Sequence, residues 1–535
     1  MALKLCNPGI HPMNTSNTRR EFLADVGRGM IIASVGGAIA TELGLAPAFA
    51  LDAPDASKAL NFGELEPLVA LMQETPVNRL LPTLTGKLKS GADLRKLVAA
   101  AALANARTFG GEDYVGFHTL MAMTPAFHMS QELPDKLQPL PVFKVLYRNT
   151  NRIQEHGGRK DEVLHPVEPG KLPEGLPPGE ALRAAVHRKD VKAAEETLAA
   201  LAQVSAEDAF NYLLHTVQET TEVHRVVLPY RAWSLLDLTG RAHAETLLRQ
   251  SVRYCVRAES YSRTSEQTES QKLLPKLLEQ HKLLERAPGK READDAWVEK
   301  LSQTFFTSTA SEAAEAAAAA LAEGFAPDAI GEAISLAANQ LVLRDHGRTP
   351  QGESPGKPVG SVHGDSIGVH ACDSANAWRN MARVSNTRNT YACLILGAFQ
   401  VALDRTNRGG DFQNWQPIPV KYHLDGIKST EADALIKEAD EAIRQNLQAR
   451  AGAIIHRYGE LGFAPRPVFD LLLRYAVSED GALHAEKYYR TVSEEFAATR
   501  APFRWRQLVA LARVTASEYG RPAPGVAEAK ELLKV

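Results

Sequence analysis

Apolar residues recur at intervals of three and four along most of the chain, which is the spacing of one buried face of an α-helix. Alternation of apolar and polar residues is scarce, and its best example, residues 417–424, fits an extended loop equally well. We therefore predict an all-α, multi-helical fold packed into one large domain. The clearest helical segments are residues 63–74, 91–108, 141–156, 205–220, 241–259 and 310–325.

Several of these segments begin with the spacing of a capping box, in which a Ser or Thr hydroxyl and an acidic side chain three residues later bond each other's backbone N–H groups. The candidate pairs are Ser90 with Asp93, Ser205 with Asp208, and Thr309 with Glu312.

Three stretches rich in proline and glycine interrupt the helical pattern, at 158–179, 347–361 and 407–419. The first is long enough to act as a linker. We therefore divide the chain after residue 50 into an N-terminal helical lobe (51–157), this linker, and a main helical domain (180–535).

A histidine follows a turn and precedes or opens a helical segment at four places in the chain. Such a recurrence is expected if the fold is built from repeated helix–turn–helix units, although the spacing between units is not constant. The four histidines are His118, His224, His363 and His484, and an arginine ends the preceding helical segment in three cases: Arg107, Arg344 and Arg474.

The segment "GSVHGDSIGVHACDSANAWRN" (360–380) has the densest set of potential ligands. If it is helical throughout, His363 and His370 share one face, and Asp373 lies on the same side. Imidazole and carboxylate groups that converge in this way can bind a first-row transition metal. The alternative is structural: Ser366 or Asp365 caps the helix, and the histidines are hydrogen-bonded core residues.

The N-terminus carries the most specific motif in the chain. Arg19 and Arg20 precede a short apolar run rich in Gly and Ala, and Ala48-Phe49-Ala50 fits a small-residue cleavage site. This layout resembles the twin-arginine export signal of bacteria, whose machinery carries folded proteins, often with a cofactor already inserted. The resemblance implies cleavage after Ala50, a periplasmic or secreted mature protein, and no integral membrane segment after cleavage.

Composition narrows the class of partner and cofactor. The chain has 61 basic and 64 acidic residues, a net charge of −3, which gives no indication of a nucleic-acid partner. It has four cysteines but no C-x-x-C-H motif, so covalent c-type haem is excluded, and no C-x-x-C pair that would indicate an iron–sulfur or Cys-rich zinc site. Phosphate-binding loops and the G-x-S-x-G motif of hydrolases are also missing from the sequence.

The recurrence of histidines predicts an interior metal site. We expect His118, His224, His363 and His370 as ligands of a transition metal, with iron, copper and manganese not distinguished. His370, Tyr230 and Asp373 are the candidate catalytic groups.

The sequence leaves three hypotheses open. The first is a metal-dependent oxidoreductase that acts on a small organic substrate, with Arg231 and Arg344 as candidate substrate-binding groups. The second is a metal-assisted hydrolase or lyase, because a bound metal also activates water. The third is a helical-repeat binding protein without catalytic activity.

Overall fold

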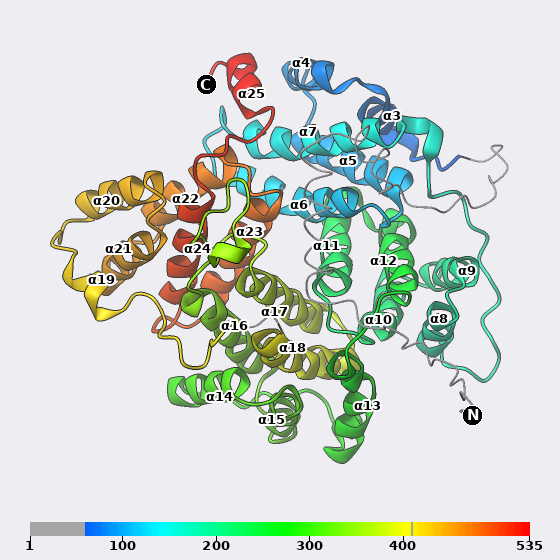
Figure 1. Ribbon diagram of the computed structural model, residues 1–535. Helices are drawn as coiled ribbons and strands as arrows, with labels where there is room; N and C mark the ends of the chain where they lie inside the picture. Colours follow the sequence, from blue (N-terminus) through cyan, green and yellow to red (C-terminus); the bar gives the residue numbers. More distant parts are fainter. Residues whose placement is uncertain (1–58, 408–409) are drawn as a thin grey trace, which may run out of the picture. The chain divides into compact units, whose positions relative to one another are not determined.

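The computed structural model describes residues 59–407 and 410–535. In this part of the chain the structure has 23 α-helices and no β-strand, so the prediction of an all-α fold is confirmed (Figure 1). The predicted export signal, with Arg19 and Arg20, lies outside the described residues.

The helices follow one another through short turns and a few longer loops. The first eleven are α3 (Glu66–Glu74), α4 (Val77–Lys89), α5 (Leu94–Phe109), α6 (Tyr114–Gln131), α7 (Pro139–Glu155), α8 (Pro178–His187), α9 (Val191–Ala202), α10 (Ala206–Val217), α11 (Val223–Thr239), α12 (Ala244–Ala258) and α13 (Ser265–Gln280). The remaining twelve are α14 (Asp295–Thr307), α15 (Ala310–Ala322), α16 (Pro327–Arg344), α17 (Ile367–Val384), α18 (Thr387–Asn407), α19 (Lys421–Asp425), α20 (Ala432–Arg444), α21 (Gln448–Glu460), α22 (Arg466–Ser478), α23 (His484–Ala498), α24 (Trp505–Glu518) and α25 (Val526–Leu533).

The predicted capping boxes are confirmed in one of three cases, where Thr309 and Glu312 form a complete reciprocal box. At Ser205 only half of the box is present: the hydroxyl accepts a hydrogen bond from the N–H of Asp208, whereas the Asp208 carboxylate accepts from the Ser205 hydroxyl. The expectation for Ser90 is wrong. Ser90 follows the last residue of α4, and Asp93 itself caps α5 by accepting from the N–H of Arg95.

The strand candidate at 417–424 is not a strand: it is a loop up to Val420, and the short helix α19 begins at Lys421. Pro229 lies inside α11, which continues to Thr239. A proline removes only one backbone donor from a helix, and the buried residues on both sides of Pro229 hold α11 against its neighbours.

Helices from distant parts of the sequence pack within one compact unit, residues 55–535. The Pro/Gly-rich segment 158–179 runs along this unit and is hydrogen-bonded to it. The N–H of Leu164 donates to the carbonyl of Arg107 (3.0 Å), and the N–H of Gly170 donates to the carbonyl of Glu196 (2.9 Å).

Four helices, α6, α11, α17 and α23, surround the centre of this unit (Figure 1). Contacts join α6 to α11, α11 to α17, α17 to α23, and α23 back to α6. Their side chains meet in the same order along each helix. Ser234 contacts Thr124 near the end of α6 and α11, and Asn376 donates to Glu495 between α17 and α23. The four helices therefore run in the same direction, and their N-termini meet at one end.

The described residues contain no helix with the combination of length and apolar character that crossing a membrane requires.

Candidate functional site

Four histidines lie together where the four central helices begin. The ring of His118 is 4.9 Å from that of His224 and 5.3 Å from that of His484, centroid to centroid. His370 completes the set at 5.4 Å from His484 and 6.1 Å from His224. We call His118, His224, His370 and His484 the histidine cluster.

Each member of the cluster belongs to the first five residues of its helix. His118 is the fifth residue of α6, His224 the second of α11, His370 the fourth of α17 and His484 the first of α23. Four helix N-termini thus direct the positive ends of their dipoles toward the same place. Such a positive field disfavours protonation of an imidazole. Nearby carboxylates would offset the positive field.

The hydrogen bonds of His118 and His224 define which ring nitrogen has a lone pair to offer. Nδ1 of His118 lies 2.8 Å from the carbonyl oxygen of Tyr114, and Nδ1 of His224 lies 2.7 Å from the carboxylate of Glu222. Both oxygens can only accept, so each Nδ1 is the protonated nitrogen. The two Nε2 atoms are then lone-pair donors. Both are buried, and neither has a hydrogen-bond partner in the described structure.

His370 and His484 face each other through the same kind of atom. Their Nε2 atoms are 3.3 Å apart. Two nitrogens bound to one ion at tetrahedral positions, each at ~2.1 Å, are about 3.4 Å apart, so this separation also suits a shared metal ligand.

Electrostatics keep His118 and His484 neutral. The pKa values of His118 and His484 lie well below the ordinary histidine value, because burial penalises the charged ring and the nearby Lys487 repels a second positive charge. Neutral imidazole is the form that binds a metal. At neutral pH His118 and His484 therefore present lone pairs.

Glu222 contributes an acidic group at the edge of the cluster. It caps α11 by accepting from the N–H groups of His224 and Arg225, and it also accepts from the hydroxyl of Tyr254 (2.7 Å). Burial opposes ionisation of this carboxyl, yet the contacts with His224 and Tyr254 lower its pKa to about 2. An ionised carboxylate behind a histidine is the usual arrangement that orients a metal-binding ring.

The described residues include no group of three or more His, Cys, Asp or Glu side chains already arranged to hold a metal ion. The four rings surround a common point, but their nitrogen atoms do not converge on it. A shared ion therefore requires the rings to turn about their side-chain bonds, with His118 and His224 bringing their Nε2 atoms inward.

The structure brings together three of the four histidines expected as ligands. The fourth, His363, is buried in the loop before α17 and makes no ring contact with the cluster among the described residues. Its place is taken by His484. The reason is local: Ser366 caps α17, so His363 lies outside the helix while His370 lies inside its first turns.

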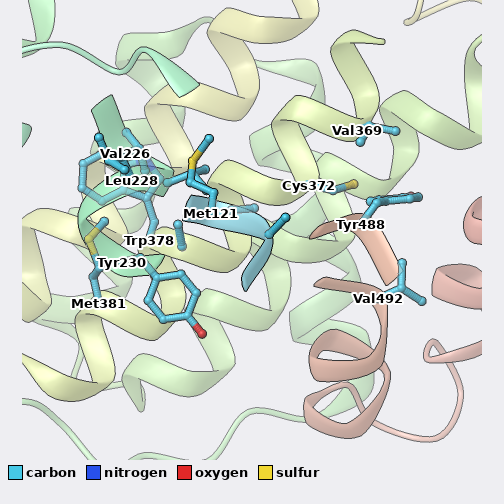
Figure 2. Packing of buried hydrophobic residues seen from close by; sticks show 14 of the residues in the cluster. Met121, Val226, Leu228, Tyr230, Val369, Cys372, Trp378, Met381, Tyr488 and Val492 are labelled. Atoms are coloured by element: carbon cyan, nitrogen blue, oxygen red, sulfur yellow. The ribbon is translucent and has the colours of Figure 1, made fainter. Parts of the chain in front are cut away.

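The candidate catalytic residues are spread along the central helices. Asp373 lies one turn after His370 and accepts from the hydroxyl of Thr491 (2.7 Å). Tyr230 lies further along, with its hydroxyl 3.3 Å from the carboxylate of Glu494. Figure 2 shows Tyr230 on the side of Trp378 and Met381, apart from Cys372 and Tyr488.

The two arginines expected to bind substrate have different surroundings. Arg344 donates to Gln340 (3.0 Å) and to the carbonyl of Trp415 (2.7 Å), so it fastens the loop before α19 and is not part of the histidine cluster. Arg231 is buried between α11 and α23, and its only hydrogen bond in the described structure is a long one to Thr491 (3.4 Å).

Lys487 is the functional candidate that sequence reasoning missed. It is buried, three residues after His484, and therefore on the same face of α23. Burial and the neighbouring Arg231 lower its pKa to about 8, although Asp373 and Glu486 act in the opposite direction. The i, i+3 spacing from His484 was the available signal.

The three cysteines of the described residues are all free and buried: Cys255, Cys372 and Cys393. Burial raises the pKa of each thiol. Cys372 lies near Tyr488 (Figure 2), which fits an inert core cysteine better than a nucleophile or ligand.

The chain matches no protein-family model, and searches of curated proteins and of solved structures found no match.

Proposed function

We propose that the protein is an exported, metal-dependent oxidoreductase, with a transition metal bound by His118, His224, His370 and His484. The observation that supports this most strongly is the set of buried nitrogen atoms. Two are Nε2 lone pairs without partners, each fixed by a hydrogen bond at the opposite nitrogen. A further two face each other at 3.3 Å.

A core cluster of four imidazoles is hard to explain by packing alone. Buried polar atoms normally find hydrogen-bond partners, and leaving one without a partner costs about 1–3 kcal/mol. A metal ion would satisfy these atoms and offset that cost. Iron and copper suit imidazole ligands, and both support redox chemistry with open coordination positions for a small substrate.

The residues around the cluster have assigned roles in this proposal. Glu222 orients the ring of His224 and supplies one negative charge near the metal. Asp373, at the next turn of α17, is the candidate group to accept or return a proton. Lys487 adds a positive charge that would attract an anionic substrate.

A metal-assisted hydrolase or lyase is the second candidate, since the same ligands can activate water. The observation that favours it is the acidic group Asp373 beside the cluster, because burial raises the pKa of this carboxyl toward the range of a general base. A binding protein without catalytic activity is the remaining alternative.

Metal analysis of the chain purified after export tests this proposal. We expect about one transition metal per chain and a spectrum that changes on reduction. A redox-inert metal would favour the hydrolase or lyase. A chain without stoichiometric metal, prepared with no chelator, would contradict both enzymatic proposals. The export itself is tested by N-terminal sequencing, which should begin at Leu51.

A further inference from the structure

A group of four charged side chains and one hydroxyl lies directly beyond the histidine cluster, between the same helices. It consists of Lys487, Asp373, Arg231, Glu494 and Thr491. Lys487 lies close enough to affect the ionisation of His118 and of Asp373, and Arg231 in turn affects Lys487, Asp373 and Glu494. We call these five residues the polar group.

Arg231 differs from the other deeply buried arginines of the described residues. It is 2% exposed and forms no ion pair in this part of the chain. Its Nε atom has no hydrogen-bond partner, as is also true of Arg249 and Arg379, but those two guanidinium groups are bound to a carboxylate through another nitrogen. The guanidinium rests on the ring of Tyr230, 4.9 Å from the centroid. Five other arginines are no more than 3% exposed, and each is bound to carboxylates or carbonyls: Arg107 to Glu66, Arg225 to Glu259, Arg249 to Glu245, Arg379 to Glu495, and Arg513 to the carbonyls of Val342, Leu343 and Asp345.

The charges of the polar group do not balance without a further anion. Glu494 is paired with Arg490 (2.7 Å). Asp373 accepts from Thr491, and no ion pair of Lys487 is found within the described residues. Arg231 and Lys487 thus bring two positive charges, against one carboxylate, Asp373. Burying an unpaired charge is costly, so a site with one negative charge missing is suited to an anionic ligand.

The geometry of Arg231 indicates the kind of anion. A guanidinium offers Nε and one Nη as two parallel donors, which match both oxygens of a carboxylate. Nε is already without a partner, and Nη2 has only its long contact to Thr491.

We propose that Arg231, assisted by Lys487, binds the carboxylate of an organic acid whose reacting carbon lies at the histidine cluster. This names the substrate class of the proposed function and rests on that function for the reaction itself. Arg231 follows His224 by seven residues, which is about 10 Å along a helix. The substrate is then a short acid of several carbons, with its carboxylate away from the metal.

Binding of straight-chain carboxylates tests this inference directly. Isothermal titration of the purified exported protein with the series from acetate to octanoate, at constant ionic strength, should give saturable binding that is best for the acids of intermediate length. The matched amides have nearly the same shape without the charge, and they should bind at least 10-fold more weakly.

Arg231→Gln should weaken binding of the best acid by roughly 10- to 100-fold, as expected for a lost charge-assisted pair of hydrogen bonds. Arg231→Lys keeps the charge without the paired donors and should give an intermediate loss, which guards against misfolding of the first variant. The control is Arg383→Gln on α17, which removes one charge from a partly exposed pair with Asp328 and should leave the affinity unchanged.

The inference is overturned if no acid of the series binds, if acids and amides bind equally, or if both Arg231 variants keep the wild-type affinity. The same titration with chelator-treated protein separates this result from the proposed function. Carboxylate binding in a chain that never contains metal would refute the function and leave the subsite. Metal without carboxylate binding would refute the subsite alone.

Discussion

Arg379 and Arg231 occupy comparable depths in the central helices, and replacing each by methionine should have opposite consequences. Arg379 Nη1 donates to Glu495 Oε2 at 2.7 Å, and both side chains are 3% exposed. Arg379 also donates to the carbonyl of Ala498 (3.1 Å). Arg231 has no such acidic partner in the described residues.

The expected magnitudes follow from these contacts. Arg379→Met leaves the Glu495 carboxylate buried, with Asn376 (2.9 Å) as its remaining donor. Removal of one partner of a buried pair typically costs about 3–5 kcal/mol. Arg231→Met instead removes a buried charge that forms no ion pair in the described residues and has only a long hydrogen bond, to Thr491. We expect the loss of stability to be below about 1 kcal/mol, or a small gain, as at sites kept for function at the expense of stability.

Urea unfolding of the metal-free protein at neutral pH, followed by far-UV circular dichroism, provides the assay. The urea concentrations at the unfolding midpoint should differ clearly between the two variants. The slope of the free energy of unfolding against urea concentration should stay similar, because this slope reports the surface exposed on unfolding. Equal destabilisation by the two substitutions would refute the reasoning. It would mean that Arg231 has structural partners and that no further anion is needed.

Three further predictions concern the surroundings of the cluster. A Cβ atom on Gly364 would lie 2.3 Å from Cβ of His484, so Gly364→Ala should displace His484 and lower the metal content by at least half. The control is Gly86→Ala, whose added Cβ meets no atom within 4 Å and which should keep the wild-type metal content. Equal metal content in the two variants would contradict this prediction. Burial lowers the pKa of His363 to about 3, so the unfolded chain takes up the proton first as the pH falls below about 6.5. The neutral buried His363 therefore contributes to the free energy of unfolding above about pH 6.5, and this contribution is lost as the pH falls toward 3. By linkage, about 2 kcal/mol is lost between pH 7 and pH 5. His363→Asn should remove that part of the pH dependence in urea titrations, and an unchanged profile would refute the assignment. A thiol reagent should label none of the three cysteines of the native mature protein, and all three in denaturant: Cys255, Cys372 and Cys393. Rapid labelling of the native protein would contradict the burial of these thiols.

Periodicity and caps were sufficient to predict the fold class, because each depends on residues close in sequence. The apolar spacing of 91–108 gives α5, and the Thr309 box marks the start of α15. The strand candidate at 417–424 failed because a short apolar alternation carries no information about the loop geometry around it.

The candidate site could be predicted only in part. The recurrence of a histidine after a turn identified His118, His224 and His484, although His484 was not among the expected ligands. His363 was expected as a ligand together with His370, and the sequence did not show that α17 begins only at Ile367, which leaves His363 outside the helix. That Arg231 forms no ion pair in the described residues is a property of packed helices, and no local pattern encodes it.

The central claim is that the histidine cluster binds a metal, and metal content per chain in matched variants tests it most directly. The wild-type protein should contain about one transition-metal ion, and alanine at any cluster position should remove most of it. Two controls should retain the metal: His363→Ala, and His215→Ala, whose ring contacts Glu180 on α8. Metal that is absent from the wild type, or retained in all four cluster variants, would contradict the account.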